Sequence, residues 1–160
     1  MRAVIIDVDG TLADVSPFRH HVVLGHPENK GYKDFKSFHD ASVDAEPHSA
    51  VVEIINALAD DVTVLIVTAR MRQWEKHTVW WLLLNDIKFD ELYMRDDGDS
   101  RKDYIVKKEI LESIRSEGYE ILFAVDDNPN VIELWQEEGI LTILVPGWMP
   151  ERTPTAHDDS

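Results

Sequence analysis

Two aspartates at the end of a short apolar run have the spacing needed for phosphoryl chemistry. The run Ala3–Ile6 is followed by Asp7, Asp9, Gly10 and Thr11. If the run is a buried strand, Asp7 can face a bound phosphate, and a sharp turn at Gly10 lets Asp9 swing back over the same place. A carboxylate is a competent nucleophile towards phosphorus, and a second acid can protonate the leaving oxygen and then activate water. The pattern therefore favours phosphoryl transfer through an aspartyl-phosphate.

Polar side chains also follow the later apolar runs of the chain. They are Thr68, Ala69, Arg70, Arg95, Asp96, Asp97, Asp99, Arg101, Lys102, Asp126 and Asp127. Ligands of open α/β sheets bind outside the carboxyl ends of the strands, so we expect this set to converge on Asp7. Plainer interpretations exist: Thr68 and the Asp126–Asp127 pair could open helices, and Arg70 could form a surface ion pair. The convergence of all four strand ends favours a catalytic site.

Carboxylates held close together favour a bound cation. Two ionised carboxylates repel each other, and a divalent cation relieves that repulsion. The chain contains no Cys, and oxygen ligands without Cys favour magnesium over zinc. Asp126 and Asp127 offer the opposite side of such an ion. Together with the ion, Thr68, Arg70 and Lys102 would neutralise charge on the transferring phosphoryl group.

The elements that position these residues alternate between strand and helix patterns. Apolar, β-branched runs lie at Ala3–Ile6, Val62–Val67, Ile121–Val125 and Leu141–Val145, with a weaker run at Phe89–Met94. Patterns of helical period separate them at Pro47–Leu58, Met71–Leu84, Lys102–Ile114 and Pro129–Gln136. The alternation predicts a doubly wound, Rossmann-like α/β fold with a parallel sheet covered on both faces. We interpret the three tryptophans of the second helical pattern as core residues.

One segment interrupts this alternation. Asp14–Glu46 is rich in His, Lys, Gly, Phe and Asp and has weak periodicity. A connection of this length inside a compact domain is usually functional. We therefore expect a small cap-like insert over residues 14–46, within a domain that spans residues 1–149. The polar segment 150–160 is expected to be a flexible tail.

Four of these features together resemble the motifs of haloacid-dehalogenase-like (HAD) phosphatases. Between residues 3 and 145, the matching positions are DVDGT at Asp7–Thr11, Thr68, Lys102 and the Asp126–Asp127 pair. The resemblance implies the HAD fold, with Asp7 as the nucleophile and Asp9 as the acid and base. It places phosphate contacts at Thr68 and Lys102. It also implies a magnesium site whose ligands are the Asp7 carboxylate, the Asp9 backbone carbonyl and Asp127, with Asp126 close behind.

Three longer stretches give a narrower resemblance. VTAR at Val67–Arg70, GDSRKDYIVKKEI at Gly98–Ile110 and AVDDNPNVIELW at Ala124–Trp135 resemble the phosphatase domain of the polynucleotide kinase–phosphatase family. The resemblance implies removal of 3′-phosphates from DNA or RNA ends. The expected catalytic cation is Lys102, and the expected substrate contacts are Thr11, Arg19, Thr68, Ala69, Arg70, Asp99 and Arg101. Bifunctional family members also carry a kinase module with a GxxxxGK[ST] loop, and this sequence contains no such loop, so we expect phosphatase activity only.

The formal net charge of −15 narrows the possible substrates. Broad binding along nucleic acid needs a basic surface, although a local basic pocket can still hold one phosphate. The charge favours one alternative, a small-molecule phosphatase such as a nucleotidase. A second alternative, a non-catalytic binding protein on the same fold, is disfavoured because both Asp7 and Asp9 are present. No apolar run can span a bilayer and no secretory signal opens the chain, so we expect a cytoplasmic protein without membrane contact; the sequence fixes no oligomeric state.

Overall fold

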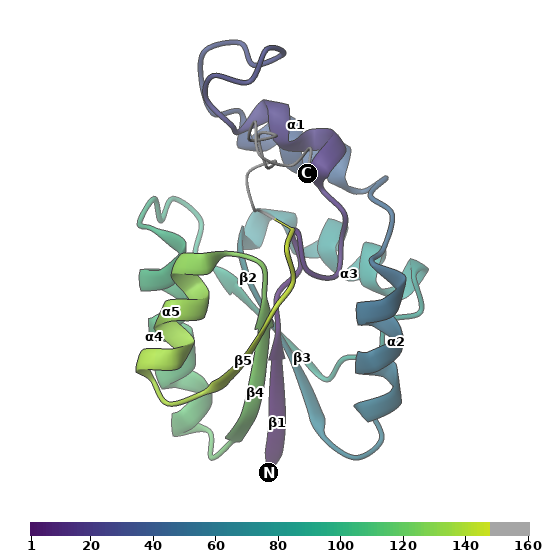
Figure 1. The fold of residues 1–160 in the computed structure, drawn as a ribbon, viewed down its shortest axis with the longest axis vertical. Coiled ribbons are helices and arrows are strands. Elements are labelled where there is room, and N and C mark those ends of the chain that lie inside the picture. Colours follow the sequence, from purple (N-terminus) through teal and green to yellow (C-terminus); the bar gives the residue numbers. More distant parts are fainter. Residues whose placement is uncertain (148–160) are drawn as a thin grey trace, which may run out of the picture.

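In the computed structural model, which describes residues 1–147, five parallel strands form a central sheet (Figure 1). The strands are β1 (Arg2–Ile6), β2 (Thr63–Met71), β3 (Glu91–Arg95), β4 (Glu120–Asp126) and β5 (Leu141–Leu144). Their order in the sheet is β3-β2-β1-β4-β5, so the chain winds outward to β3 and then outward again on the other side of β1. This order confirms the doubly wound α/β fold. The tail expected at 150–160 lies outside the described residues.

Helices cover both faces of the sheet, as the alternation predicts. They are α2 (Ser49–Leu58), α3 (Glu75–Leu84), α4 (Asp103–Ser116) and α5 (Pro129–Glu137). Alternate residues of β1 enter two cores: Val4 and Ile6 pack on the α2 and α3 side, and Ala3 and Ile5 pack on the α4 and α5 side. A strand covered on both faces meets water on neither, which explains the continuous apolar run. Among residues 1–147, no helix has the length and apolar character needed to cross a bilayer.

The second helical pattern begins later than expected. β2 continues through Met71, a short 3-10 turn named η2 (Arg72–Trp74) follows, and α3 starts at Glu75. Trp81 is buried against the sheet, but Trp80 is 54% exposed. The prediction that all three tryptophans lie in the core is therefore wrong for Trp80, and Trp74 is only partly buried and lies outside both hydrophobic cores. The reason is that α3 is apolar around most of its circumference, and only one side of it can face the sheet.

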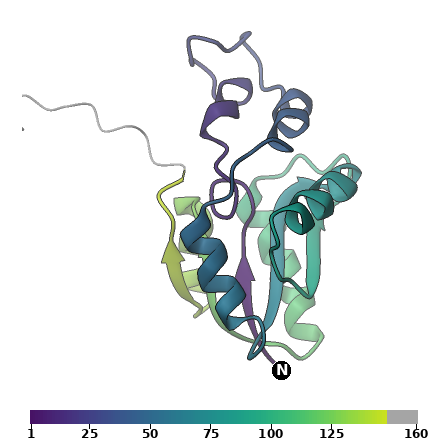
Figure 2. The same cartoon turned by 90° about the vertical axis from the view of Figure 1, so that its right-hand side faces the viewer.

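The segment after β1 stands above the carboxyl ends of the strands (Figures 1 and 2). It contains a 3-10 turn, η1 (Ser16–His21), and a helix, α1 (Phe35–Ser42). The Asp34 side chain caps α1 by accepting a hydrogen bond from the Ser37 amide at 3.0 Å. Phe38 of α1 is buried in the core that α2 and α3 also enter, and Trp81 Nε1 donates to the Ala45 carbonyl at 2.9 Å. These contacts fix the insert against the sheet domain.

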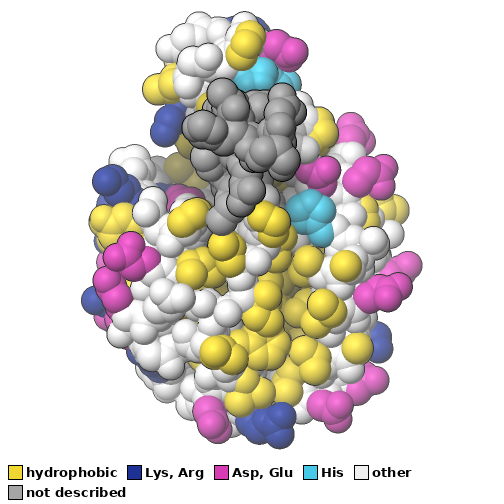
Figure 3. All heavy atoms as spheres, in the orientation of Figure 1, with side chains coloured by type: hydrophobic (Ala, Val, Ile, Leu, Met, Phe, Trp, Pro, Cys, Tyr) yellow, Lys and Arg dark blue, Asp and Glu magenta, His cyan; other side chains and the backbone are white. Residues whose placement is uncertain are grey.

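Hydrophobic side chains gather on the face of the molecule that carries β5 and α2 (Figure 3). The exposed apolar residues of these elements include Ile54 on α2 and Leu141 and Ile143 on β5. Among residues 1–147, β5 pairs with β4 alone, so within this part of the chain the apolar surface ends at an unpaired sheet edge, which natural proteins usually protect with charged residues.

Candidate active site

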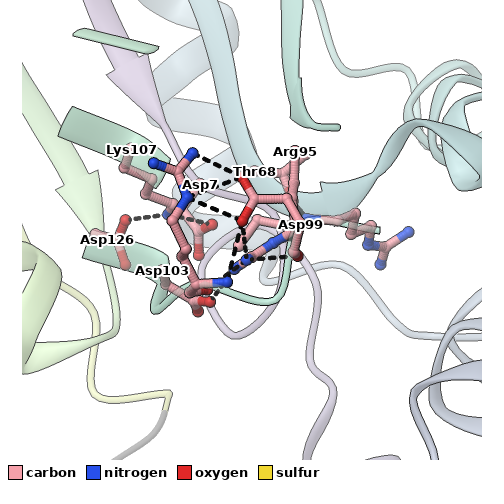
Figure 4. A network of polar contacts seen from close by, with 10 residues as sticks. Asp7, Thr68, Arg95, Asp99, Asp103, Lys107 and Asp126 are labelled. Atoms are coloured by element: carbon pink, nitrogen blue, oxygen red, sulfur yellow. Dashed lines mark hydrogen bonds and ion pairs between the residues drawn. The ribbon is translucent and has the colours of Figure 1, made fainter. Parts of the chain in front are cut away.

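The carboxyl ends of β1, β2 and β4 bring the expected acidic residues together. Asp7 follows β1, Thr68 lies in β2 and Asp126 ends β4, and Figure 4 shows these three side chains in one region. The strands meet there because β1 lies between β2 and β4 in the sheet. Gly10 has a φ of 83°, a left-handed conformation that lets the chain turn back immediately after β1. The buried polar residues of this region include Asp7, Thr11, Thr68, Asp126 and Asp127.

A lysine that the sequence analysis did not single out is bonded to two of these carboxylates. Lys107 Nζ lies 2.8 Å from Asp7 Oδ1 and 2.6 Å from Asp126 Oδ2 (Figure 4). Burial disfavours the ammonium, but attraction to the two carboxylates prevails and raises the pKa of Lys107 above its ordinary value. Lys107 is therefore charged at neutral pH and neutralises part of the acidic cluster.

The structure corrects the assignment of Lys102. This residue is the N-cap of α4, and its side chain is exposed. Lys107 lies further along α4 on the buried side of the helix, which also carries Leu111 and Ile114. The structure therefore places Lys107, not Lys102, against Asp7. The spacing of four and seven residues to two core positions was the available signal, because a charged residue on an apolar stripe needs a buried partner.

Asp7, Asp126 and Asp127 form a cluster suited to a cation. One carboxylate oxygen of each lies within 4.8 Å of the others. Burial, followed by repulsion from the neighbouring carboxylates, raises the pKa of Asp7 and that of Asp127. Asp127 Oδ2 is buried without a hydrogen-bond partner among the described residues, which is unfavourable for a polar atom. A divalent cation would relieve both the repulsion and the unpaired oxygen, and a set of oxygen ligands fits magnesium.

The hydrogen bonds of Thr11 and Asp126 show which carboxylate oxygens of this cluster remain available to bind a cation. Thr11 Oγ1 lies 3.0 Å from Asp7 Oδ2 and 3.2 Å from Asp127 Oδ1, so its single proton can serve either acid. Asp126 Oδ1 accepts hydrogen bonds from the amides of Asp127 and Asn128 at 2.9 and 3.1 Å. Its other oxygen faces the buried lysine. Asp7 and Asp127 are therefore the acids best placed to face a cation, and Thr11 lies between them.

Asp9 and Arg70 form a buried ion pair with two hydrogen bonds. Arg70 Nε donates to Asp9 Oδ2 at 2.9 Å, and Arg70 Nη2 donates to Asp9 Oδ1 at 2.5 Å. The same guanidinium donates to Thr78 Oγ1 on α3 at 3.2 Å and to Ser42 Oγ on α1 at 3.3 Å. The Arg70 amide donates to Thr68 Oγ1 at 3.2 Å. Although burial opposes ionisation, the guanidinium lowers the pKa of Asp9, so Asp9 is held here as a carboxylate.

Asp99 and Arg101 pair with each other in the loop before α4. Arg101 Nη2 lies 2.8 Å from Asp99 Oδ2, and Arg101 Nη1 lies 2.5 Å from Glu109 Oε1. Arg95 orders this loop by donating to the carbonyls of Ala69 and Asp99 at 2.9 and 3.0 Å, as part of the network in Figure 4. In the described chain, no hydrogen bond or ion pair joins Asp99 or Arg101 to the acidic cluster. Substrate contact by these residues and by Ala69 stays a prediction.

Arg19 brings a cation from the insert towards the site. It lies on η1 and is partly buried. Burial lowers the pKa of Arg19, while the nearby charges of Asp127 and Asp14 act in the opposite direction. The charge of Asp127 thus acts on Arg19, and an incoming phosphate at the acidic cluster needs positive partners of this kind.

The comparison with known families identifies the type of domain. A family model described as the polynucleotide kinase PNKP phosphatase domain matches residues 1–146. The chain belongs to this family. A relative of this PNKP phosphatase domain is a protein of Autographa californica nuclear polyhedrosis virus, named as a bifunctional polynucleotide kinase/RNA ligase, with 28% identity over 146 residues. The match covers 89% of this chain and 19% of the viral protein, so the PNKP-type domain spans a minor part of that relative.

Solved structures agree with this assignment. A chain in the structure of the Pnkp1/Rnl/Hen1 complex matches the PNKP-type domain with a TM-score of 0.73 and 25% identity, over 90% of this chain and 45% of that chain. A HAD-like family hydrolase from Porphyromonas gingivalis matches with a TM-score of 0.55 and 12% identity, over 93% of both chains. The second likeness concerns the fold alone. Together these findings confirm the resemblance to HAD phosphatases of the PNKP type.

Proposed function

We propose that the chain is a magnesium-dependent phosphatase that removes 3′-phosphates from DNA or RNA ends through an aspartyl-phosphate. The observation that carries the chemistry is the position of Asp7, which lies where three strand ends meet and is 2.8 Å from the ammonium of Lys107. The family supports the substrate class, because its description joins a phosphatase domain to polynucleotide kinase. The name of the viral relative also refers to polynucleotide and RNA.

The first step transfers the phosphoryl group to Asp7. A carboxylate oxygen of Asp7 forms a bond to phosphorus while the bond from phosphorus to the 3′ oxygen of the strand breaks. Asp9 takes up a proton from water when the substrate loosens its ion pair with Arg70, and it then gives that proton to the leaving 3′ oxygen. Lys107 keeps Asp7 in the carboxylate form by stabilising its negative charge. Arg19 supplies positive charge to the phosphate from the insert.

The second step returns the enzyme to its starting state. Water attacks the phosphorus of the aspartyl-phosphate, Asp9 accepts the proton of that water, and Asp7 leaves as a carboxylate with release of inorganic phosphate. Magnesium held by Asp7, Asp127 and the Asp9 carbonyl would supply charge neutralisation for the phosphoryl oxygens. Thr68, which lies in β2 three residues before the strand ends, would donate a hydrogen bond to the same oxygens.

The acidic surface supports a second candidate, a small-molecule phosphatase such as a nucleotidase. A net charge of −15 repels a polymer of phosphates more strongly than it repels one nucleotide. Under this alternative, activity falls steeply as a substrate is lengthened from a 3′-mononucleotide to an oligonucleotide. Under the leading proposal, activity holds or rises with length.

The deciding experiment compares two oligonucleotides of one sequence, phosphorylated at the 3′ end or at the 5′ end, with Mg²⁺ present. The leading proposal expects inorganic phosphate from the 3′-phosphorylated strand. Asp7→Asn, which keeps the size of the side chain, should release none from either strand while giving the same circular dichroism spectrum. If neither strand loses phosphate while small nucleotide or sugar phosphates do, the nucleotidase alternative replaces the proposal.

A further inference from the structure

Four aromatic rings form a row that runs from the insert to the sheet domain. We name Phe35, His39, Trp74 and His77 the aromatic row. The ring centroids are 6.3 Å apart for Phe35 and His39, and 5.2 Å apart for His39 and Trp74. Those of Trp74 and His77 are 5.5 Å apart. Phe35 is 53% exposed and His77 is exposed, whereas His39 is buried between them. The row therefore has a solvent-facing end on α1 and another on α3.

The buried middle of the aromatic row lies beside the ion pair of the site. Ser42, one turn after His39 on α1, accepts the hydrogen bond from Arg70 at 3.3 Å. The charges of Asp9 and Arg70 both reach His39, and burial together with Arg70 lowers the pKa of His39 to about 4. His39 is thus neutral beside Asp9 at neutral pH. Phe35 lies roughly 10 Å from Ser42 along α1, given the rise of a helix, so the row leads outward from the site.

The leaving nucleoside of the substrate has to lie near this buried middle of the aromatic row. In the proposed reaction Asp9 protonates the oxygen that joins the phosphate to the strand, so the terminal nucleoside lies next to Asp9. An exposed aromatic ring offers a flat surface on which a base can stack. In the sequence, the exposed lysines Lys30, Lys33 and Lys36 lie within five residues of Phe35, and Lys36 pairs with Asp40 at 2.6 Å. Aromatic rings with neighbouring cations are the combination that binds single-stranded nucleic acid.

We propose that the aromatic row binds the terminal base of a nucleic-acid strand whose 3′-phosphate lies at Asp7. The base stacks on Phe35 at the open end of the row, and the lysines beside Phe35 lie along the backbone of the strand. This inference rests on the proposed function and adds a specificity to it. The enzyme distinguishes a 3′-phosphate end that carries a base from an end that lacks one, by about tenfold in kcat/KM, the size expected for stacking of one base.

The test uses two oligonucleotides that differ only at the terminal 3′-phosphorylated residue, which is an ordinary nucleotide in one and an abasic tetrahydrofuran in the other. The measured quantity is the ratio of kcat/KM for the two ends. The variants are Phe35→Ala, Phe35→Trp and, as a matched control, Trp80→Ala. Trp80 is an aromatic residue of nearly the same exposure, 54%, that lies outside the row. Circular dichroism and thermal unfolding check that each variant folds.

The expected result is a ratio near ten for the unchanged chain, for Trp80→Ala and for Phe35→Trp, and a ratio near one for Phe35→Ala. An unchanged ratio in Phe35→Ala, or a ratio of one in the unchanged chain, overturns the proposal. Equal losses on both ends in a folded Phe35→Ala overturn it as well, because a stacking contact acts on the base. If the unchanged chain releases phosphate from neither end, the proposed function itself fails, and that outcome is distinct from the others.

Discussion

Lys107 Nζ lies 2.8 Å from Asp7 Oδ1, although 100 positions separate the two residues in the sequence. The contact joins the end of β1 to the buried side of α4 and is made within the acidic cluster. It places a positive charge beside the proposed nucleophile independently of any substrate. Because the same ammonium also meets Asp126 at 2.6 Å, it offsets two buried negative charges at once.

The first prediction concerns this ammonium. Lys107→Met keeps most of the length of the side chain but leaves Asp7 and Asp126 without their buried cation. We expect phosphatase activity to fall by at least about 100-fold. The free energy of unfolding in metal-free buffer should fall by about 3–5 kcal/mol, as when one partner of a buried pair is removed. Steady-state kinetics and urea unfolding measure the two effects. Lys102→Met is the matched control at an exposed position of the same helix, and equal losses in both variants would contradict the corrected assignment.

The second prediction concerns the cation. Mg²⁺ should raise the melting temperature of the chain, because it relieves repulsion among the buried acids. At a Mg²⁺ concentration of 100 times Kd, the free energy of unfolding should gain about 2.7 kcal/mol. Asp127→Asn should lose most of that gain, since Asp127 Oδ2 is the buried oxygen without a partner in the described chain. Asp99→Asn changes an acid outside the cluster and should keep the gain. Scanning calorimetry with and without Mg²⁺ measures this gain in stability. A full gain in Asp127→Asn would show that Asp127 is not a ligand of the metal.

The sequence predicted the parts of the site that follow from one rule about parallel sheets. Asp7, Thr68, Asp126 and Asp127 each come at or just after the end of an apolar run, and parallel strands place such ends at one edge. The same rule did not identify Lys107, because this residue lies inside a helix and not at a strand end. Its signal was a charge on an apolar stripe, and reading that signal requires knowing which partner lies below the stripe.

Other features depend on contacts between elements that no single segment specifies. Arg70 was expected to contact substrate, yet its guanidinium binds Asp9, and that geometry depends on how β2 and the turn after β1 meet. The helix α1 has eight residues, and its place is set by Phe38 entering the core of the sheet domain. Trp80 was expected in the core for its residue type alone, but burial depends on which side of α3 faces the sheet.

The third prediction concerns the pair of Asp9 and Arg70. Arg70→Lys keeps a positive charge but cannot make two parallel hydrogen bonds to a carboxylate. We expect a loss of about 2–4 kcal/mol in the free energy of unfolding, and a much smaller loss when the same change is made in an Asp9→Asn background. Urea unfolding of the four chains measures this coupling.

The exposed pair of Arg72 and Asp96, 3.0 Å apart, supplies the control for that cycle. Arg72→Lys should change the free energy of unfolding by less than about 1 kcal/mol, because solvent screens a surface ion pair. If Arg70→Lys costs the same with and without Asp9, the buried pair does not act as a unit.

The last prediction concerns acid and the buried imidazole of His39. Burial lowers the pKa of His39 from 6.5 to about 4, so between these values the unfolded chain binds more protons at this residue than the folded chain. The stability linked to His39 is therefore complete above pH 6.5 and is lost as the pH falls through 4, by about 3 kcal/mol in total. His39→Phe keeps a ring in the aromatic row and removes the proton site. Relative to the unchanged chain, this variant should gain about 3 kcal/mol in the free energy of unfolding between pH 7 and pH 4, measured with urea.

Comparing the two chains at each pH cancels the titration of Asp7 and Asp127, whose raised pKa values act in the opposite direction. If the difference for His39→Phe were independent of pH, His39 would have to be open to water in solution, and the insert would not be closed over Asp9 and Arg70 as the structure has it.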